Sequence, residues 1–246
     1  ISEFFILFAL FGVVDWAKNN NLKSIVIALI GFTGATFFHG AMMIGAVCFI
    51  AIVGFFSFKN LFKSILNFRV NKKFFLFFVV FAVSSLFYLS NKINVPYLGN
   101  FQSSTNIDNL LYRTQNATRG DAAWPEWTKI NSPTELIYKS PIRAAYVVFA
   151  PFPWDVKKTK HLIGMFDAFL YMYLTYLILK NLKVIWKDPA LRIILILLLS
   201  YIFVFGIGVG NFGTGIRHRS KFAVLFILLA APFLKKFIFF KNKVRT

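Results

Sequence analysis

Long apolar runs separated by short polar and basic segments make up most of this chain. A helix needs roughly 20 mainly apolar residues to cross about 30 Å of hydrocarbon. One long run is broken only at His39-Gly40, and we divide it there because it is nearly twice the length that one crossing needs. By this measure the pattern predicts about seven transmembrane helices, near residues 3–16, 24–38, 40–57, 74–91, 162–180, 191–209 and 222–240.

The predicted fold is all-α, a polytopic transmembrane helical bundle with one larger extracytoplasmic loop that contains short helices. Residues 1–91 hold four N-terminal spans, residues 92–161 the loop, and residues 162–246 three C-terminal spans. Within the loop, Ser132-Pro133-Thr134-Glu135 predicts a capping box and a helix that Pro141 kinks or ends. The following run is too short to span, so we expect an interfacial or re-entrant helix there.

Composition supports a membrane protein, because 58% of the residues are hydrophobic and the mean hydropathy is +0.65. The net charge of +19 would suggest a nucleic-acid partner in a soluble protein. Here the basic residues gather at the ends of apolar runs, so we expect membrane lipid and no nucleic acid as partner. Cys48 is the only cysteine and the three histidines have no zinc-site spacing, so we expect no metal and no cofactor.

The distribution of basic residues predicts the orientation, because short cytoplasmic loops carry an excess of lysine and arginine. With seven crossings, four basic segments and the C-terminus fall on the cytoplasmic side; these segments contain Lys18 and Lys23, Lys59 to Lys73, Lys180 to Arg192, and Lys235 to Arg245. The His39 turn, residues 92–161 and residues 210–221 then lie on the opposite face. Because the chain opens inside an apolar run at Ile1, we interpret it as the C-terminal part of a longer protein.

The segment GNFGTGIRHRSKF, residues 210–222, places Arg217, His218, Arg219 and Lys221 together on the face where short basic loops are disfavoured. These residues either anchor the last span on lipid headgroups or bind a phosphate, since guanidinium suits bidentate phosphate binding. The glycines before them either allow a tight turn and close helix packing or expose N–H groups to an anion. They match G-x-G-x-x-G, but no strand precedes them, which argues against a dinucleotide site.

Other candidate site residues carry two interpretations each. His39 and His218 are either general bases or histidines satisfied within the bundle. Asp167 lies inside a predicted span, where it either has a function or pairs with a nearby arginine or lysine. The segment 119–127 joins aromatic, acidic and basic residues, which favours either sugar binding or interface anchoring; its candidates are Arg119, Asp121 and Trp124.

Three short motifs and the order of the predicted spans and loops resemble those of a known protein family. FFHGAMMIG at residues 37–45, APFPW at 150–154 and GNFGTGIRHR at 210–219 resemble bacterial polysaccharide polymerases of the O-antigen polymerase type. The resemblance implies a glycosyltransferase of the bacterial inner membrane that moves an undecaprenyl-pyrophosphate-linked glycan at the periplasmic face without a metal. A chain-length regulator or other assembly proteins would be further partners.

Carried onto this sequence, the resemblance makes Arg217 and Arg219 pyrophosphate ligands, with Arg143 as a third. It makes His39 and His218 the candidates for the base. The arginine-to-glycine spacing described for polymerase loops is not matched at Arg119 or at Arg113. The alternatives are a glycosyltransferase with a phospho-polyprenol monosaccharide donor, which would rely on external acids, a transporter or flippase of lipid-linked or anionic solutes, and a structural membrane subunit.

Overall fold

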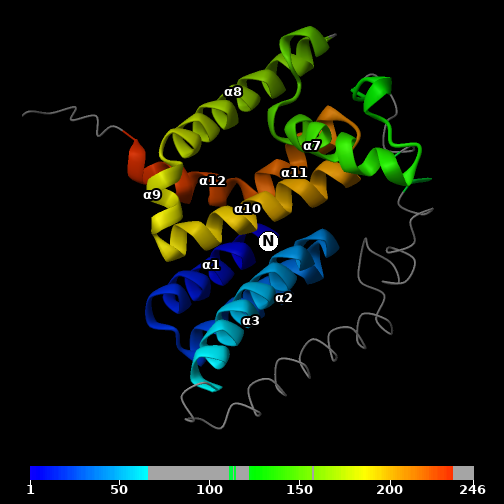
Figure 1. Ribbon diagram of the computed structural model, residues 1–246. Coiled ribbons are helices and arrows are strands. Elements are labelled where there is room, and N and C mark those ends of the chain that lie inside the picture. Colours follow the sequence, from blue (N-terminus) through cyan, green and yellow to red (C-terminus); the bar gives the residue numbers. More distant parts are fainter. Residues whose placement is uncertain (66–110, 113, 115–121, 157, 235–246) are drawn as a thin grey trace, which may run out of the picture.

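A computed structural model describes residues 1–65, 111–112, 114, 122–156 and 158–234 (Figure 1). The described residues are helical apart from short connections and one isolated bridge between Ala123 and Asn211. The α-helices are α1 Ser2–Asn19, α2 Leu22–Phe38, α3 Met43–Ile65, α7 Pro133–Phe149, α8 Thr159–Lys180, α9 Leu182–Lys187, α10 Pro189–Gly208, α11 Phe212–Arg219 and α12 Ala223–Ala230. The 3-10 helices are η1 Gly40–Met42, η2 Glu126–Thr128, η3 Pro153–Asp155, η4 Ser220–Phe222 and η5 Ala231–Phe233.

Three helical segments of the described chain are long and apolar enough to cross a membrane: Gly40–Ser57, His161–Lys180 and Pro189–Gly208. Helices also form at three other predicted spans, but α1 carries Glu3, Asp15 and Lys18, α2 has only 17 residues, and α12 has eight. The prediction at 74–91 and the last part of that at 222–240 lie outside the described residues. Three candidate spans, rather than seven, are therefore what the described chain contains.

The first two helices form a close hairpin. Asn20, in the left-handed region at φ 50°, ends α1, and the Asn21 side chain caps α2 by accepting a bond from the Ser24 N–H at 2.8 Å. A Cβ added at Gly12 would lie 2.5 Å from the backbone nitrogen of Ala28. The small residues thus allow the two backbones to approach closely.

The bundle has two distinct ends (Figure 1). At one end the His39 ring lies 5.6 Å from that of Phe205, near the last turn of α10. At the other, the Trp16 ring lies 6.1 Å from that of Phe56, and the Arg192 guanidinium lies 5.9 Å from the same Phe56 ring. We call these the His39 end and the Trp16 end. The sequence pattern places the His39 turn and residues 210–221 on the same face of a membrane, and in the structure His39 and His218 lie together at the His39 end.

The sequence predicts that Pro141 kinks or ends the helix. Pro141 does not end it, because α7 continues through this proline to Phe149. Pro141 and Ile137, whose carbonyl loses its helical bond, both lie on the exposed face, while Arg143 and Tyr146 lie on the buried one. The lost hydrogen bond therefore falls away from the packed side. The helix begins at Pro133 as predicted.

The predicted capping box does not form at the start of α7. The Ser132 side chain makes no capping bond, and its Oγ lies 3.0 Å from Thr134 Oγ1. Glu135 instead accepts from the Asn131 N–H at 2.8 Å and pairs with Lys139 at 2.9 Å. Its pKa is lowered by these two partners, the Asn131 N–H first.

Candidate functional site

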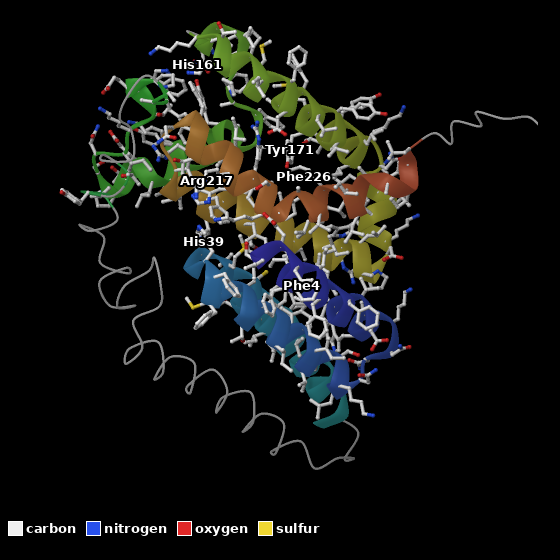
Figure 2. All side chains as sticks on the ribbon, turned by 180° about the vertical axis from the view of Figure 1, so that it is seen from behind. Phe4, His39, His161, Tyr171, Arg217 and Phe226 are labelled. Carbon is white, nitrogen blue, oxygen red and sulfur yellow. The ribbon has the colours of Figure 1, made fainter. Side chains whose placement is uncertain are left out.

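Four basic side chains gather at the His39 end of the bundle: His39, Arg217, His218 and Lys221. We call them the cationic cluster. His39 joins α2 to η1 in an extended conformation, and its N–H donates to the Ala35 carbonyl at 3.0 Å. Arg217 and His218 come from α11, and Lys221 from η4. His39 and Arg217 lie at this same end in Figure 2.

The short helix α11 buries one of its arginines and exposes the other. Asn211 caps it by accepting a bond from the Thr214 N–H at 2.8 Å. Phe212 and Arg219 are buried on one face, at positions i and i+7 of the helix. Arg217, two residues before Arg219, falls on the opposite face and is exposed. Helical geometry alone thus gives these two arginines different surroundings.

The two histidines predicted from distant parts of the sequence are in contact. Their ring centroids are 5.0 Å apart with the rings nearly perpendicular, and His218 also stacks on Phe205 at 4.8 Å. Lys221 Nζ lies 3.2 Å from His218 Nδ1. Within the described chain, the Arg217 guanidinium makes no hydrogen bond or ion pair with protein.

Burial and mutual repulsion disfavour positive charge in the cluster. Burial first, and then Lys221, lower the pKa of His39 to about 4 and that of His218 to about 3. Burial and then Arg217 lower the pKa of Lys221 to about 8, while Glu3 acts in the opposite direction. At neutral pH both histidines are therefore neutral and Lys221 is mainly an ammonium.

This charge distribution fixes the tautomer of His218. A lysine ammonium has only donors, so Lys221 donates and His218 Nδ1 accepts. The proton of the neutral His218 ring is then on Nε2. His218 thus offers a hydrogen-bond donor rather than a free base nitrogen, and an anion placed here would relieve the repulsion among the cations.

Arg219 is fully buried and bonded entirely to protein. Its Nε donates to Asp167 Oδ2 at 2.6 Å, and Nη2 forms the second contact of this ion pair. Nη1 donates to the carbonyls of Val148 and Ala150 at 2.9 and 2.7 Å, and Nη2 to that of Gly164 at 3.1 Å. Arg219 therefore joins the end of α7 and the start of α8 to α11. It is also the partner that one interpretation predicted for Asp167.

Arg143 is fully buried as well, at the C-terminus of α10. Nε donates to the Gly206 carbonyl at 3.1 Å, and Nη2 to the carbonyls of Ile207, at 3.0 Å, and Val209. Nη1 donates to the Thr128 carbonyl at 2.9 Å. The last carbonyls of a helix lack partners within the helix, and a cation there also complements the helix dipole. Burial lowers the pKa of Arg143 to about 10, so it stays charged at neutral pH.

These contacts separate the predicted phosphate ligands into two groups. The guanidinium groups of Arg143 and Arg219 are enclosed and committed to protein acceptors, so neither is open to a pyrophosphate. Arg217 is exposed beside the two histidines. We therefore build the candidate site on the cationic cluster and assign Arg143 and Arg219 to its support.

The tryptophans in and near the segment 119–127 differ in exposure. Trp124 is only 2% exposed and lies under the Arg143 guanidinium, 5.2 Å from it. Trp127 and Trp154 are 55% and 74% exposed. Trp127 belongs to the segment 119–127 that the sequence favours for sugar binding or interface anchoring, whereas Trp154 was not selected as a site residue. Trp127 lies 5.9 Å from Tyr146, and Trp154 stacks at 4.9 Å on Phe152, which is 5.2 Å from Tyr146. The other two candidates of this segment, Arg119 and Asp121, lie outside the described residues.

The loop that carries Trp124 is attached to the connection between α10 and α11. The Trp124 N–H donates to the Gly210 carbonyl at 2.9 Å, and the Phe212 N–H to the Ala122 carbonyl at 2.8 Å. A Cβ added at Gly206 would lie 2.7 Å from the backbone of Ala144, so this glycine allows α7 and α10 to pack closely. The loop and α7 are thereby held at the end of α10 that leads into α11.

Among the described residues, no group of three or more histidine, cysteine, aspartate or glutamate side chains could hold a metal ion. Comparison with protein-family models, with curated proteins and with solved structures finds no match to this chain. The geometry of the cationic cluster is therefore the basis for a proposal about function.

Proposed function

We propose that this protein is a glycosyltransferase of the bacterial inner membrane that moves a polyprenyl-pyrophosphate-linked glycan at the extracytoplasmic face. The observation that carries the proposal is the cationic cluster, in which Arg217, His218 and Lys221 provide donors beside His39. In this proposal the whole chain has about seven spans, residues 92–161 are extracytoplasmic, and the C-terminus is cytoplasmic.

Charge complementarity favours a pyrophosphate ligand for the cluster. Arg217 offers an exposed guanidinium, Lys221 an ammonium and His218 an Nε2–H donor. Glu3 is the carboxylate that acts on Lys221, and it offsets only part of the positive charge. Such donors stabilise a departing pyrophosphate as negative charge develops on it.

His39 is the proposed general base. Its lowered pKa keeps the ring neutral at physiological pH, and its neighbour His218 is already committed to Lys221 through Nδ1. In an inverting displacement, the acceptor hydroxyl oxygen attacks the anomeric carbon of the donor glycan and His39 takes the hydroxyl proton. The bond from that carbon to the phosphate oxygen breaks, and its electron pair leaves with the polyprenyl pyrophosphate.

The distribution of lysine supports an extracytoplasmic position for the cluster. At the Trp16 end, Lys18 and Lys23 flank the turn between α1 and α2, and Lys183 and Lys187 lie on α9. An excess of basic residues in short loops marks the cytoplasmic side. With the Trp16 end in the cytoplasm, the His39 end faces the compartment in which carrier-linked glycans would be extended.

We assign the sugar rings to the exposed faces of Trp127 and Trp154. Aromatic faces stack on pyranose rings, and these indoles flank Tyr146 on the α7 side of the bundle. Together with the cluster they would give donors for the phosphates and apolar faces for the glycan.

The test replaces the full-length protein in its own cell by a His39→Gln variant. The rate of polymer extension is measured from the length distribution of lipid-linked glycan. Loss of a general base lowers such rates by about 10²–10⁴-fold, so single repeats should accumulate. Lys183→Ala, at the opposite end, is the control and should extend polymer normally. Normal extension by His39→Gln at an unchanged protein level would refute the proposed role of His39.

A further inference from the structure

Four phenylalanines border the cationic cluster: Phe4 and Phe5 of α1, and Phe37 and Phe38 of α2. We call them the phenylalanine border. Phe5 stacks on Phe38 at 5.7 Å, Phe4 meets Phe5 edge-on at 5.6 Å, and Phe37 meets Phe38 in the same way at 5.6 Å. Phe4 and Phe37 are 66% and 69% exposed. The four rings thus form one continuous aromatic surface with two open faces.

This surface adjoins the cationic cluster on two sides. Phe38 directly precedes His39 in the chain. Glu3, the neighbour of Phe4, acts electrostatically on Lys221, which places the first turn of α1 beside η4. Phe4 lies at this start of α1 in Figure 2. Cationic and aromatic groups therefore meet at one place.

The aromatic surface continues along α1 toward the Trp16 end. Phe4, Phe8 and Phe11 stand at positions i, i+4 and i+7 and are 66%, 40% and 67% exposed. This spacing places them on one helix face. Seven residues of helix extend about 10 Å along the axis. An apolar chain lying here would run from the cluster into the depth of the bilayer.

We propose that the phenylalanine border binds the first units of the polyprenyl chain whose pyrophosphate binds the cationic cluster. The inference rests on the proposed function, and it adds a separate binding surface for the chain. Two cations beside an open aromatic surface complement a ligand with a highly charged head and a branched apolar tail. An ordinary bilayer phospholipid carries a single phosphodiester charge and matches this charge less well.

The experiment measures how affinity depends on chain length. Dissociation constants of the detergent-solubilised full-length protein are measured for inorganic pyrophosphate, geranyl pyrophosphate and farnesyl pyrophosphate. In the wild type, each added isoprene unit should tighten binding. The Phe4→Ala, Phe38→Ala double variant should lose about tenfold of the affinity gained between pyrophosphate and farnesyl pyrophosphate, because it removes apolar area from the contact. Its affinity for inorganic pyrophosphate should stay within about twofold of the wild type.

A matched control removes two phenylalanines from a different exposed face. Phe166 and Phe169 of α8 are 71% and 45% exposed, and the Phe166→Ala, Phe169→Ala variant should keep the full dependence on chain length. Partition of the probe into detergent is the same for all variants, so only a specific surface separates the two double variants.

The outcomes distinguish the inference from the function beneath it. Wild-type protein that binds no pyrophosphate probe would overturn the proposed function and the inference together. Binding that is independent of chain length, or an equal loss in both double variants, would overturn the inference alone. Displacement of farnesyl pyrophosphate by phosphatidylglycerol at equal concentration would also overturn it, because the surface would then be a general lipid contact.

Discussion

Arg217 and Arg219 stand two residues apart on one short helix, yet they belong to two different regions of the molecule. Arg219 is fully enclosed, with Asp167 and three carbonyls around it. Arg217 is exposed, and the groups that act on its neighbours are mainly other cations. All the surroundings of Arg219 are thus protein acceptors that satisfy its donors. Around Arg217, protein groups balance only part of the positive charge.

The difference teaches how to assign arginines in a membrane bundle. A buried guanidinium whose donors all reach protein acceptors stabilises the junction of several elements. A cation that lies among other cations lowers their pKa values, and an external anion that binds there relieves the repulsion among them. Arg143 belongs to the first kind, since it binds the carbonyls at the end of α10.

The largest effect is expected from Arg219→Ala. The substitution leaves Asp167 without its cation and the carbonyls of Val148 and Ala150 without a donor. The Asp167 side chain is 37% exposed, so the main cost is the loss of the donor to these two buried carbonyls, about 1–3 kcal/mol for each. We expect a large fall in the thermal unfolding midpoint in detergent and in the yield of monodisperse protein. The matched control is Arg217→Ala, which should change stability by less than about 0.5 kcal/mol. Equal unfolding midpoints for the two variants would remove the distinction between the regions.

Arg143→Ala should have the next largest effect. It leaves the carbonyls of Gly206 and Ile207 at the end of α10 without a donor, and an unsatisfied buried group costs about 1–3 kcal/mol. The unfolding midpoint is the measurement, with Arg192→Ala as control because the Arg192 side chain is bonded only at the Trp16 end. A midpoint equal to the wild type would mean that Arg143 does not stabilise this junction.

A smaller effect is expected from pH. The pKa of Lys221 is lowered to about 8, and a bound anion raises the pKa of a lysine. Binding then takes up a proton above pH 8, so affinity for farnesyl pyrophosphate should fall about tenfold between pH 7.5 and pH 9.5. The two histidines beside Lys221 do not titrate in this window, because the pKa values of His39 and His218 are lowered to about 4 and about 3. The charged groups that act on Lys221 are Arg217 and Glu3.

The control for this pH effect is Lys221→Arg. An arginine at this position stays protonated throughout the window, so the variant should bind farnesyl pyrophosphate with nearly constant affinity. A fall in the variant as large as that in the wild type would assign the pH dependence to another group.

Sequence reasoning could predict the elements whose signals are local. The break at His39 follows from the length of the hydrophobic run, and the start of α7 at Pro133 follows from proline chemistry. Whether α7 ends at Pro141 or runs through it could not be decided from the sequence, because the outcome depends on which face of the helix packs against α10.

The sequence also did not show which arginines are buried and which are exposed. Arg217 and Arg219 look equivalent in the segment GIRHR, and only the placement of Phe212 against the core decides which one is buried. The contact between His39 and His218 was not predictable in detail either, although both residues could be selected as candidates. The contact depends on side-chain packing around Phe205, because the rings of both histidines lie against the ring of this residue.

The central claim is that the cationic cluster, and not the buried arginines, holds the pyrophosphate. The most direct measurement compares farnesyl pyrophosphate binding by the Arg217→Ala, Lys221→Ala double variant with binding by Lys183→Ala, Lys187→Ala, which removes the same charge at the Trp16 end. Loss of two charged donors should weaken binding by about 100-fold or more in the first variant, with an unchanged unfolding midpoint. The control should bind like the wild type. Equal affinity of the two double variants would contradict the claim.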